Sequence, residues 1–267
     1  MRTTEEIRNV DPHDLIAPPR HNRIDPFVQR WVAGTNGNLY VSAINKLERY
    51  PIPRWPGPLP GSSGSRMLDI GCGWGRWMMA AANAGWTPYG IDIKAEAAAA
   101  ATRVLRAHNR PGQAVAGDLT SLPFPDSHFD LVFSYSVLQH VSRQRVSKCL
   151  TEVLRVLKPG GQCVIEFPVY PGLTNWRHAK GSDENPDSWD VRYYDWRELH
   201  EVFGEFAGVR MKSDCILGIG VKFEDIDLLP WKYKPVALIS EVFRLTTLLA
   251  PPLTRFSDSV FVLGRKS

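Results

Sequence analysis

MLDIGCGWGRW, residues 67–77, runs from apolar side chains directly into glycines at positions 71, 73 and 75. A short apolar run of this kind predicts a buried strand. Glycine has no side chain, so glycines at alternate positions let the backbone turn sharply and come close to a ligand. The stretch therefore predicts a strand, a ligand-binding turn and the start of a helix.

Two kinds of nucleotide are held by turns of this type. A dinucleotide fingerprint has the spacing G-x-G-x-x-G, whereas the third glycine here comes one residue early and is followed by Arg76. Asp69, two residues before Gly71, would repel a pyrophosphate but attract an amino group and a sulfonium. These features favour S-adenosylmethionine over NAD, although the turn by itself leaves both open.

Strand and helix patterns alternate after this turn. Apolar runs predict strands at 66–70, 87–92, 113–118, 129–135, 162–167, 208–217 and 258–266. Segments with helix-forming composition lie between them at 75–85, 94–109, 142–157, 195–204 and 235–250, with Asp195 as an N-cap. The alternation predicts an α/β fold, with a Rossmann-like, seven-stranded, mostly parallel sheet and helices on both faces.

Two further carboxylates end the second and third predicted strands. Asp92 is placed to accept hydrogen bonds from both ribose hydroxyls of a nucleoside. Asp118 is placed to accept one from an adenine amino group. The alternative is structural, because an aspartate at a strand end often only caps the following helix.

Taken in order, the segments LDIGCGWG, GID, GDLTSLPFPDSHFD and LKPGGQCVIEF resemble the class I S-adenosylmethionine-dependent methyltransferases. The resemblance covers residues 65–167 and is nearest to the branch with quinone C-methyltransferases and small-molecule O-methyltransferases. Outside that core, SYSVLQHV, VRYYDWREL and LTRFSDSVFVLGRK are similar to bacterial methyltransferases of glycan and secondary-metabolite gene clusters.

This resemblance implies a binding site for S-adenosylmethionine. It assigns the methionine part to Asp69 and the glycine turn, the ribose to Asp92 and the adenine amino group to Asp118. The expected cofactor-binding residues are Asp69, Gly71, Cys72, Gly73, Trp74, Gly75, Asp92, Ile93, Asp118, Leu119, Ser134 and Tyr135.

Methyl transfer to a hydroxyl group requires a base that takes the proton. His140, in VLQHV, is the leading candidate in the sequence, and Glu166 and Tyr135 are the other expected catalytic residues. Each has a structural alternative: a histidine bonded to backbone, or a side chain that lines or packs the pocket.

Composition argues against several other functions. The net charge of +4 is spread along the chain, and SYSV stands where nucleic-acid amino methyltransferases carry an NPPY-type motif, so no nucleic-acid partner is expected. The four cysteines have no C-x-x-C spacing, which predicts reduced thiols, no metal site and a cytoplasmic location. The N-terminus lacks an apolar segment, so we expect neither a signal peptide nor an integral membrane segment.

The chain is expected to divide into an N-terminal arm and linker, residues 1–64, and a methyltransferase domain, residues 65–267. Insertions at 168–194 and 218–256 are expected to cover the acceptor together with the arm. They carry aromatic residues that suit a sugar, a flat ring or a prenyl tail, or that only staple the loops: Trp176, Trp189, Tyr193, Tyr194 and Trp231. The apolar helix at 235–250 is expected to be buried or to face a second copy in a homodimer, with contact to a lipid-linked acceptor as the alternative.

The sequence thus predicts an enzyme that methylates a small molecule, at the oxygen of a sugar or secondary-metabolite hydroxyl. One alternative is C-methylation of a quinone-like or lipid-linked ring. The other is a partner subunit that binds the cofactor without catalysis.

Overall fold

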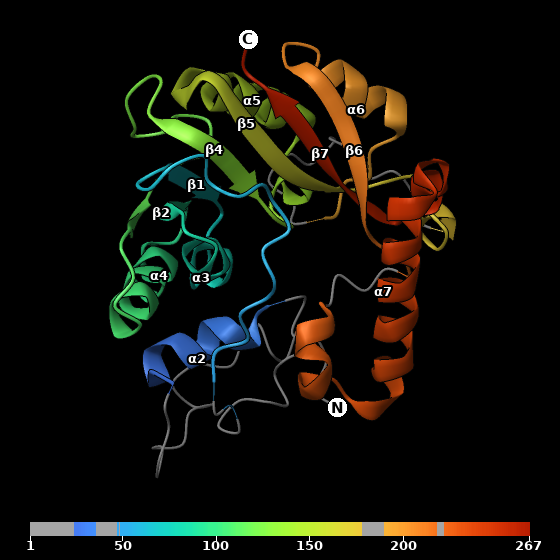
Figure 1. Ribbon diagram of the computed structural model, residues 1–267, viewed down its shortest axis with the longest axis horizontal. Coiled ribbons are helices and arrows are strands. Elements are labelled where there is room, and N and C mark those ends of the chain that lie inside the picture. Colours follow the sequence, from blue (N-terminus) through green and yellow to red (C-terminus); the bar gives the residue numbers. More distant parts are fainter. Residues whose placement is uncertain (1–23, 36–46, 48, 178–189, 218–221) are drawn as a thin grey trace.

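The computed structural model describes residues 24–35, 47, 49–177, 190–217 and 222–267. Seven strands form one sheet in the order β3-β2-β1-β4-β5-β7-β6 (Figure 1). Neighbours from β3 to β5 are parallel, whereas β7 runs antiparallel to both β5 and β6. The mostly parallel seven-stranded sheet predicted from the sequence is confirmed.

The strands lie close to the predicted positions. Their bounds are β1 Arg66–Ile70, β2 Thr87–Asp92, β3 Gln113–Ala116, β4 Phe129–Ser134, β5 Leu157–Pro168, β6 Ala207–Cys215 and β7 Ser259–Arg265. β5 begins five residues earlier than expected, because Leu157 already pairs with Phe129. The register then shifts, so that Leu131 pairs with Gln162.

The helices alternate with the strands as the pattern predicted. The α-helices are α2 Pro26–Ala33, α3 Arg76–Asn83, α4 Ala95–Ala107, α5 Arg143–Val156, α6 Trp196–Val202 and α7 Lys234–Leu249. The 3₁₀ helices are η3 Leu138–His140, η4 Asn175–Arg177, η5 Phe223–Leu228, η6 Trp231–Tyr233 and η7 Pro251–Phe256. Asp195 caps α6 as predicted, in a capping box with Glu198.

Apolar side chains cover the sheet on both faces. Val132 of β4 packs in a cluster with Leu150 of α5 and Phe203 after α6. Phe133, the next residue along β4, packs on the opposite face with Trp77 of α3. Successive strand residues point to opposite faces, so this one strand serves both layers and holds its carboxyl end in a fixed position.

The start of the described chain packs against the layer that contains α3 and α4. Val28 and Val32 of α2 are fully buried in a cluster with Met78 of α3 and Leu105 of α4. Asp25 caps α2 and also pairs with Arg103 on α4.

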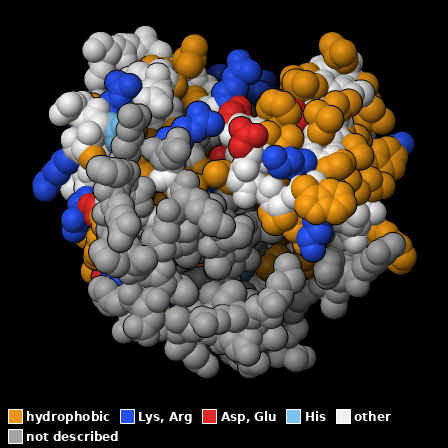
Figure 2. All heavy atoms as spheres, turned by 90° about the horizontal axis from the view of Figure 1, so that it is seen from below, with side chains coloured by type: hydrophobic (Ala, Val, Ile, Leu, Met, Phe, Trp, Pro, Cys, Tyr) orange, Lys and Arg blue, Asp and Glu red, His pale blue; other side chains and the backbone are white. Residues whose placement is uncertain are grey.

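α7 differs from the expectation of a buried helix. Ala237, Ser240 and Thr247 are its buried residues, while several of its leucines are about half exposed or more. The buried alternative is wrong, because the polar stripe of α7, and not its apolar face, packs on the protein. Figure 2 shows hydrophobic side chains gathered on the side of the molecule where Figure 1 places α7. Contact with a second copy stays a prediction.

Candidate functional site

A cavity of about 850 Å³ lies where β1 and β4 end beside β5. It is lined by residues that follow β1 (Gly71 to Trp74), by residues that follow β4 (Tyr135 to Val137), and by Glu166 of β5. β1 lies between β2 and β4, so the order of strands reverses there. Ligands of open α/β sheets bind at such a point.

The backbone of the glycine turn requires glycine at position 71 and leaves open space at Gly73. Gly71 has a φ of 72°, and an added Cβ would lie 2.3 Å from Cγ2 of Val137, so no side chain fits. Gly73, with a φ of 51°, would meet nothing within 4 Å and presents open backbone. The turn is fixed to β2 because the Gly71 amide donates to the Ile91 carbonyl at 2.8 Å. The open backbone at Gly73 is therefore held ready for a ligand.

Asp69 lies beneath this turn. It is 1% exposed, and its Oδ2 accepts no hydrogen bond within the described part of the chain. Burial and the charge of Asp92 raise the pKa of the Asp69 carboxyl well above its usual range. A buried carboxylate oxygen without a donor favours a ligand that brings one, such as an ammonium group.

Asp92 is bound on both oxygens by backbone amides. Its Oδ2 accepts from Gly73 and its Oδ1 from Lys94, each at 2.9 Å. Asp92 does not cap α4, whose N-cap is Lys94 without a side-chain cap hydrogen bond, but it binds the amide of the residue that precedes the helix. Each carboxylate oxygen can accept more than one hydrogen bond, so Asp92 keeps the capacity to accept hydrogen bonds from the hydroxyl groups of a ligand.

Asp118 follows β3 and is about two-fifths exposed. The Thr120 amide and hydroxyl donate to its Oδ1 and the Arg145 guanidinium to its Oδ2, and these groups lower the pKa of Asp118 to about 2. Ile93 follows the end of the neighbouring strand β2 and is 68% exposed, so it leaves an apolar surface open there. A charged acceptor and an exposed apolar side chain suit an adenine ring.

Three of the residues expected to contact the cofactor instead have side chains that contact other parts of the protein. The Ser134 hydroxyl is buried and donates to the Ile70 carbonyl at 2.9 Å. The Trp74 indole is buried and donates to the Thr35 hydroxyl at 2.9 Å. Leu119 packs against the main core. These side chains shape the site from behind, although Trp74 also lines the cavity.

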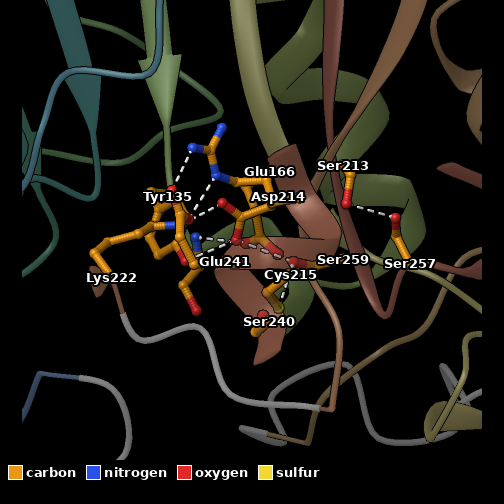
Figure 3. A network of polar contacts seen from close by, with 12 residues as sticks. Tyr135, Glu166, Ser213, Asp214, Cys215, Lys222, Ser240, Glu241, Ser257 and Ser259 are labelled. Atoms are coloured by element: carbon orange, nitrogen blue, oxygen red, sulfur yellow. Dashed lines mark hydrogen bonds and ion pairs between the residues drawn. The ribbon is translucent and has the colours of Figure 1, made fainter. Parts of the chain in front are cut away.

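The far wall of the cavity carries a buried polar network (Figure 3). The Tyr135 hydroxyl donates to Oδ2 of Asp214 at 2.9 Å, and Asp214 forms an ion pair with Lys222. Glu166 accepts from the Ser136 amide at 2.9 Å. Sequence reasoning identified Tyr135 and Glu166 but missed Asp214 and Lys222, since neither lies in a recognisable motif.

Lys222 is enclosed as well as paired. Its ammonium lies 4.7 Å from the ring centroid of Tyr135, 5.6 Å from that of Phe261 and 5.9 Å from that of Trp77. Aromatic faces attract a cation, so the rings and Asp214 hold the ammonium beside the cavity wall.

These charges set the acidity of Glu166. Burial, reinforced by the charge of Asp214 and opposed by the Lys222 ammonium, raises the pKa of the Glu166 carboxyl to about 8. Glu166 is 5% exposed and lines the cavity. It is therefore a buried carboxyl group that gains and loses a proton near neutral pH, which is the property of a general base or acid.

His140 lies on the same cavity, in η3. Its Nε2 is 3.1 Å from Nε2 of Gln139, which also lines the cavity. Arg76, which also lines it, forms a buried ion pair with Asp225 of η5 and so ties the segment before α7 to the glycine turn.

Comparison with known proteins agrees with this geometry. A model of the methyltransferase domain matches residues 68–165. A 24-methylenesterol C-methyltransferase of rice, Oryza sativa subsp. japonica, is 39% identical over 39% of the chain and 29% of its own length. An uncharacterized methyltransferase of Mycolicibacterium vanbaalenii is 34% identical over 57% of the chain and 54% of its own length.

The comparisons thus identify a methyltransferase domain at residues 68–165. The chain spans about a third and about half of the lengths of the two relatives named. Among solved structures, the PH0226 protein of Pyrococcus horikoshii aligns with 77% of the chain and 83% of its own (TM-score 0.52, 15% identity). The cyclase SpnF aligns with 80% of the chain and 86% of its own (TM-score 0.51, 19% identity). At these identities the two structures show a shared fold only.

The residues of the methyltransferase domain fit its cofactor, S-adenosylmethionine. An unpartnered carboxylate oxygen at Asp69 meets a ligand that carries an ammonium group, and the open backbone at Gly73 allows close approach. Acceptor oxygens follow at Asp92, the last residue of β2, and at Asp118, just after β3. All three acids thus stand at carboxyl ends of adjacent strands, as the sequence predicted.

The segments outside the domain core reach the same cavity. Thr35 after α2, Tyr193 before α6 and Tyr233 of η6 line it. Of the other aromatic residues expected to cover the acceptor, Tyr194 is fully buried, and Trp176 and Trp231 are 58% and 82% exposed. Trp189 lies outside the described residues.

The pKa of Glu166 predicts a pH dependence. If Glu166 acts as the base, it works only when deprotonated, so kcat should rise about tenfold per pH unit and level off above about 8. The charge of Asp214 raises this pKa. Replacing Asp214 by Asn should therefore move the rise to lower pH, by about one unit. Single-turnover rates between pH 5 and pH 10, with cofactor saturating, measure both profiles. A purely structural Asp214 would lower the rate without moving the profile.

Proposed function

We propose that the chain transfers the methyl group of S-adenosylmethionine to a hydroxyl group of a small molecule, such as a sugar or secondary metabolite. The observation that carries this proposal is the position of Glu166, a buried carboxyl with a raised pKa on the wall of the cavity beside the glycine turn. A hydroxyl acceptor has to lose a proton as it is methylated, so a base at this place matches O-methylation.

When bound, S-adenosylmethionine supplies an activated methyl group on a good leaving group. Asp69 and the glycine turn would hold its methionine part, Asp92 its ribose and Asp118 its adenine amino group. Glu166 would take the acceptor proton on its carboxylate, since Tyr135 keeps its own: burial raises the pKa of the Tyr135 hydroxyl well above its usual range. Tyr135 would orient the acceptor, and His140 is the second candidate base on the cavity.

We further propose that residues 1–64, with the insertions 168–194 and 218–256, select the acceptor. Supporting this, Thr35 of the arm and Tyr193 and Tyr233 of the two insertions line the cavity. They would also exclude water from the methyl group, which is what a methyltransferase site chiefly has to provide beyond alignment.

C-methylation of a quinone-like or lipid-linked ring is the second candidate function. Trp77 and Tyr135, with ring centroids 4.8 Å apart, give the cavity an aromatic wall that suits a flat acceptor. The rice relative is named as a sterol C-methyltransferase. If a phenolic ring and a non-phenolic ring are tested as acceptors, an enzyme specific for oxygen should methylate only the phenol.

A third candidate, a partner subunit that binds cofactor without catalysis, belongs to another class. SpnF, named as a [4+2]-cyclase, has the same fold, so the fold alone does not establish methyl transfer. A human relative that is 37% identical over 38% of the chain is named as a probable tRNA methyltransferase. We expect a small-molecule acceptor nonetheless, because the sequence carries no basic run of the kind that binds nucleic acid.

Calorimetric titration with S-adenosylmethionine and with NADH tests the cofactor assignment. We expect saturable binding of S-adenosylmethionine and none of NADH, because Asp69 stands where a pyrophosphate would have to approach. A screen of sugars, phenols and quinones with labelled S-adenosylmethionine then tests transfer. Binding of NADH alone would refute the assignment, and cofactor binding without transfer to any acceptor class would favour the non-catalytic subunit.

A further inference from the structure

Asn175, the first residue of η4, lines the cavity beyond the end of β5. It is 5% exposed. Its Nδ2 donates to two backbone carbonyls, that of Val169 at 3.0 Å and that of Asp258 at 2.7 Å. A carbonyl oxygen only accepts hydrogen bonds, so these two contacts decide which atom of the side-chain amide is the nitrogen. Oδ1 is therefore the remaining polar atom, and it accepts no hydrogen bond from the described residues.

Two strand ends hold this side chain in its orientation. Val169 directly follows β5 and Asp258 directly precedes β7, and the Val169 amide donates to the Asp258 carbonyl at 2.9 Å. The backbone amide of Asn175 also donates to Oδ1 of Asp258, at 3.1 Å. Since both hydrogens of Nδ2 are engaged, the carboxamide cannot turn without breaking two hydrogen bonds. Its Oδ1 is therefore a preorganised acceptor.

The surroundings of this oxygen favour a neutral hydrogen-bond donor. A buried oxygen without a hydrogen bond is unfavourable, and a ligand that brings a donor removes that cost. The Asp258 carboxylate beside it already accepts from the amide and the hydroxyl of Thr174 and from the Asn175 amide. A cationic group would thus find the charge of Asp258 bound by these donors, whereas a hydroxyl group matches the neutral oxygen of Asn175.

Asn175 and Glu166 line the same cavity at separate points. Val169, whose carbonyl holds Asn175, comes three residues after Glu166, which corresponds to roughly 10 Å of extended chain. Pro168 lines the cavity between them and has no polar atom in its side chain. An acceptor molecule whose reacting hydroxyl lies at Glu166 therefore needs a second hydroxyl group, across its ring, to reach Asn175.

We propose that Asn175 determines acceptor specificity, because its Oδ1 accepts a hydrogen bond from a second hydroxyl group of the acceptor, one that is not methylated. This inference rests on the proposed O-methylation and narrows the acceptor to a polyhydroxylated molecule of the sugar class. A simple quinone or a monohydric phenol has no second hydroxyl and leaves Oδ1 unsatisfied. Sites that bind a hydroxyl group discriminate against the analogue without it, because a buried polar group is then left unpaired.

Deoxy analogues test the proposal on the unchanged chain. The acceptors are the methyl α-glycosides of glucose, mannose and galactose, each with its monodeoxy counterparts, and the methyl donor is labelled S-adenosylmethionine. At least one glycoside should be methylated. For that glycoside, removal of one hydroxyl other than the methylated one should lower kcat/KM about tenfold or more. If every such deoxy analogue reacts as well as the complete glycoside, the proposal is wrong.

Asn175→Ala assigns the effect to this residue. The variant should lose about tenfold in kcat/KM with the complete glycoside, and little more with the deoxy analogue that lacks the bound hydroxyl. It also loses two hydrogen bonds to the backbone, so thermal unfolding and the affinity for S-adenosylmethionine are measured beside it. An equal loss with the complete and the deoxy glycoside would overturn the proposal, because Asn175 would then only hold the loop.

Asn83→Ala is the matched control. Asn83 is an exposed asparagine at the end of α3 and does not line the cavity, so every kcat/KM should stay unchanged. Phenol and benzyl alcohol, which have one hydroxyl each, separate this proposal from the proposed function. Transfer to either of them but to no glycoside would overturn the polyhydroxylated acceptor and leave O-methylation standing. Transfer to none of these acceptors, by a chain that binds S-adenosylmethionine, would count against both.

Discussion

Replacing Glu166 by Gln is expected to lower kcat by about 10²- to 10⁴-fold, the usual contribution of a positioned general base. Glutamine has the same shape and can still accept the hydrogen bond from the Ser136 amide, which lies 2.9 Å from Glu166. It cannot take up a proton, so the step that removes the acceptor proton should fail. Rapid-quench single turnovers, with the acceptor found by screening, measure the effect.

Cofactor affinity is the control for this variant. Glu166 lies on β5, away from Asp69, Asp92 and Asp118, so the dissociation constant of S-adenosylmethionine should stay within about twofold. His140→Ala is the comparison variant, because Glu166 is proposed as the base and His140 is the second candidate. Full activity of Glu166→Gln together with an inactive His140→Ala would transfer the role of base to the histidine.

Replacing Asp92 by Ala is expected to weaken binding of S-adenosylmethionine about 10²-fold. The carboxylate is proposed to accept hydrogen bonds from two ribose hydroxyls, each worth about 1.5–3 kcal/mol to a charged acceptor. The variant also loses the acceptor for the Gly73 and Lys94 amides, which loosens the glycine turn and the start of α4. Isothermal titration at constant pH measures the loss.

A modified ligand separates the two contributions of Asp92. An S-adenosylhomocysteine analogue without the ribose hydroxyls should bind the unchanged chain weakly, and Asp92→Ala should weaken it little further. If Asp92→Ala weakens binding of this analogue as much as it weakens binding of the normal ligand, Asp92 only organises the turn. An unchanged affinity of Asp92→Ala for the normal ligand would contradict any role for Asp92 in the site.

The candidate cofactor side of the site could be proposed from the sequence because its signals are local. Asp69, Gly71 and Gly73 lie within five residues, and Asp92 and Asp118 each end a strand that the apolar pattern marks. The carboxyl ends of parallel neighbouring strands meet at one edge of a sheet, so recognising the strands places these side chains together. The structure adds that Asp92 also binds the turn and the next helix, which strand patterns do not reveal.

The opposite cavity wall, where the acceptor is proposed to bind, was predictable only in part. Tyr135 and Glu166 follow from their strands, but Asp214 meets Tyr135 across 79 positions of sequence. That meeting depends on β7 running antiparallel between β5 and β6, which brings the end of β6 to the cavity. A pattern of alternating strands and helices gives no order for the final two strands, so Asp214 and Lys222 had no sequence signal.

The sequence alone determined the strands, the glycine turn and the carboxylates at the strand ends, because each depends on neighbouring residues and on the regular geometry of parallel strands. Tertiary structure decided which distant groups share the cavity wall with Glu166. It therefore also decided the raised pKa of Glu166, because burial and the charge of Asp214, opposed by the Lys222 ammonium, act only once the sheet has formed. It also decided which face of α7 meets the solvent. The periodicity of α7 shows that the helix has a polar and an apolar side, but only its packing against β6 shows that the polar side faces inward.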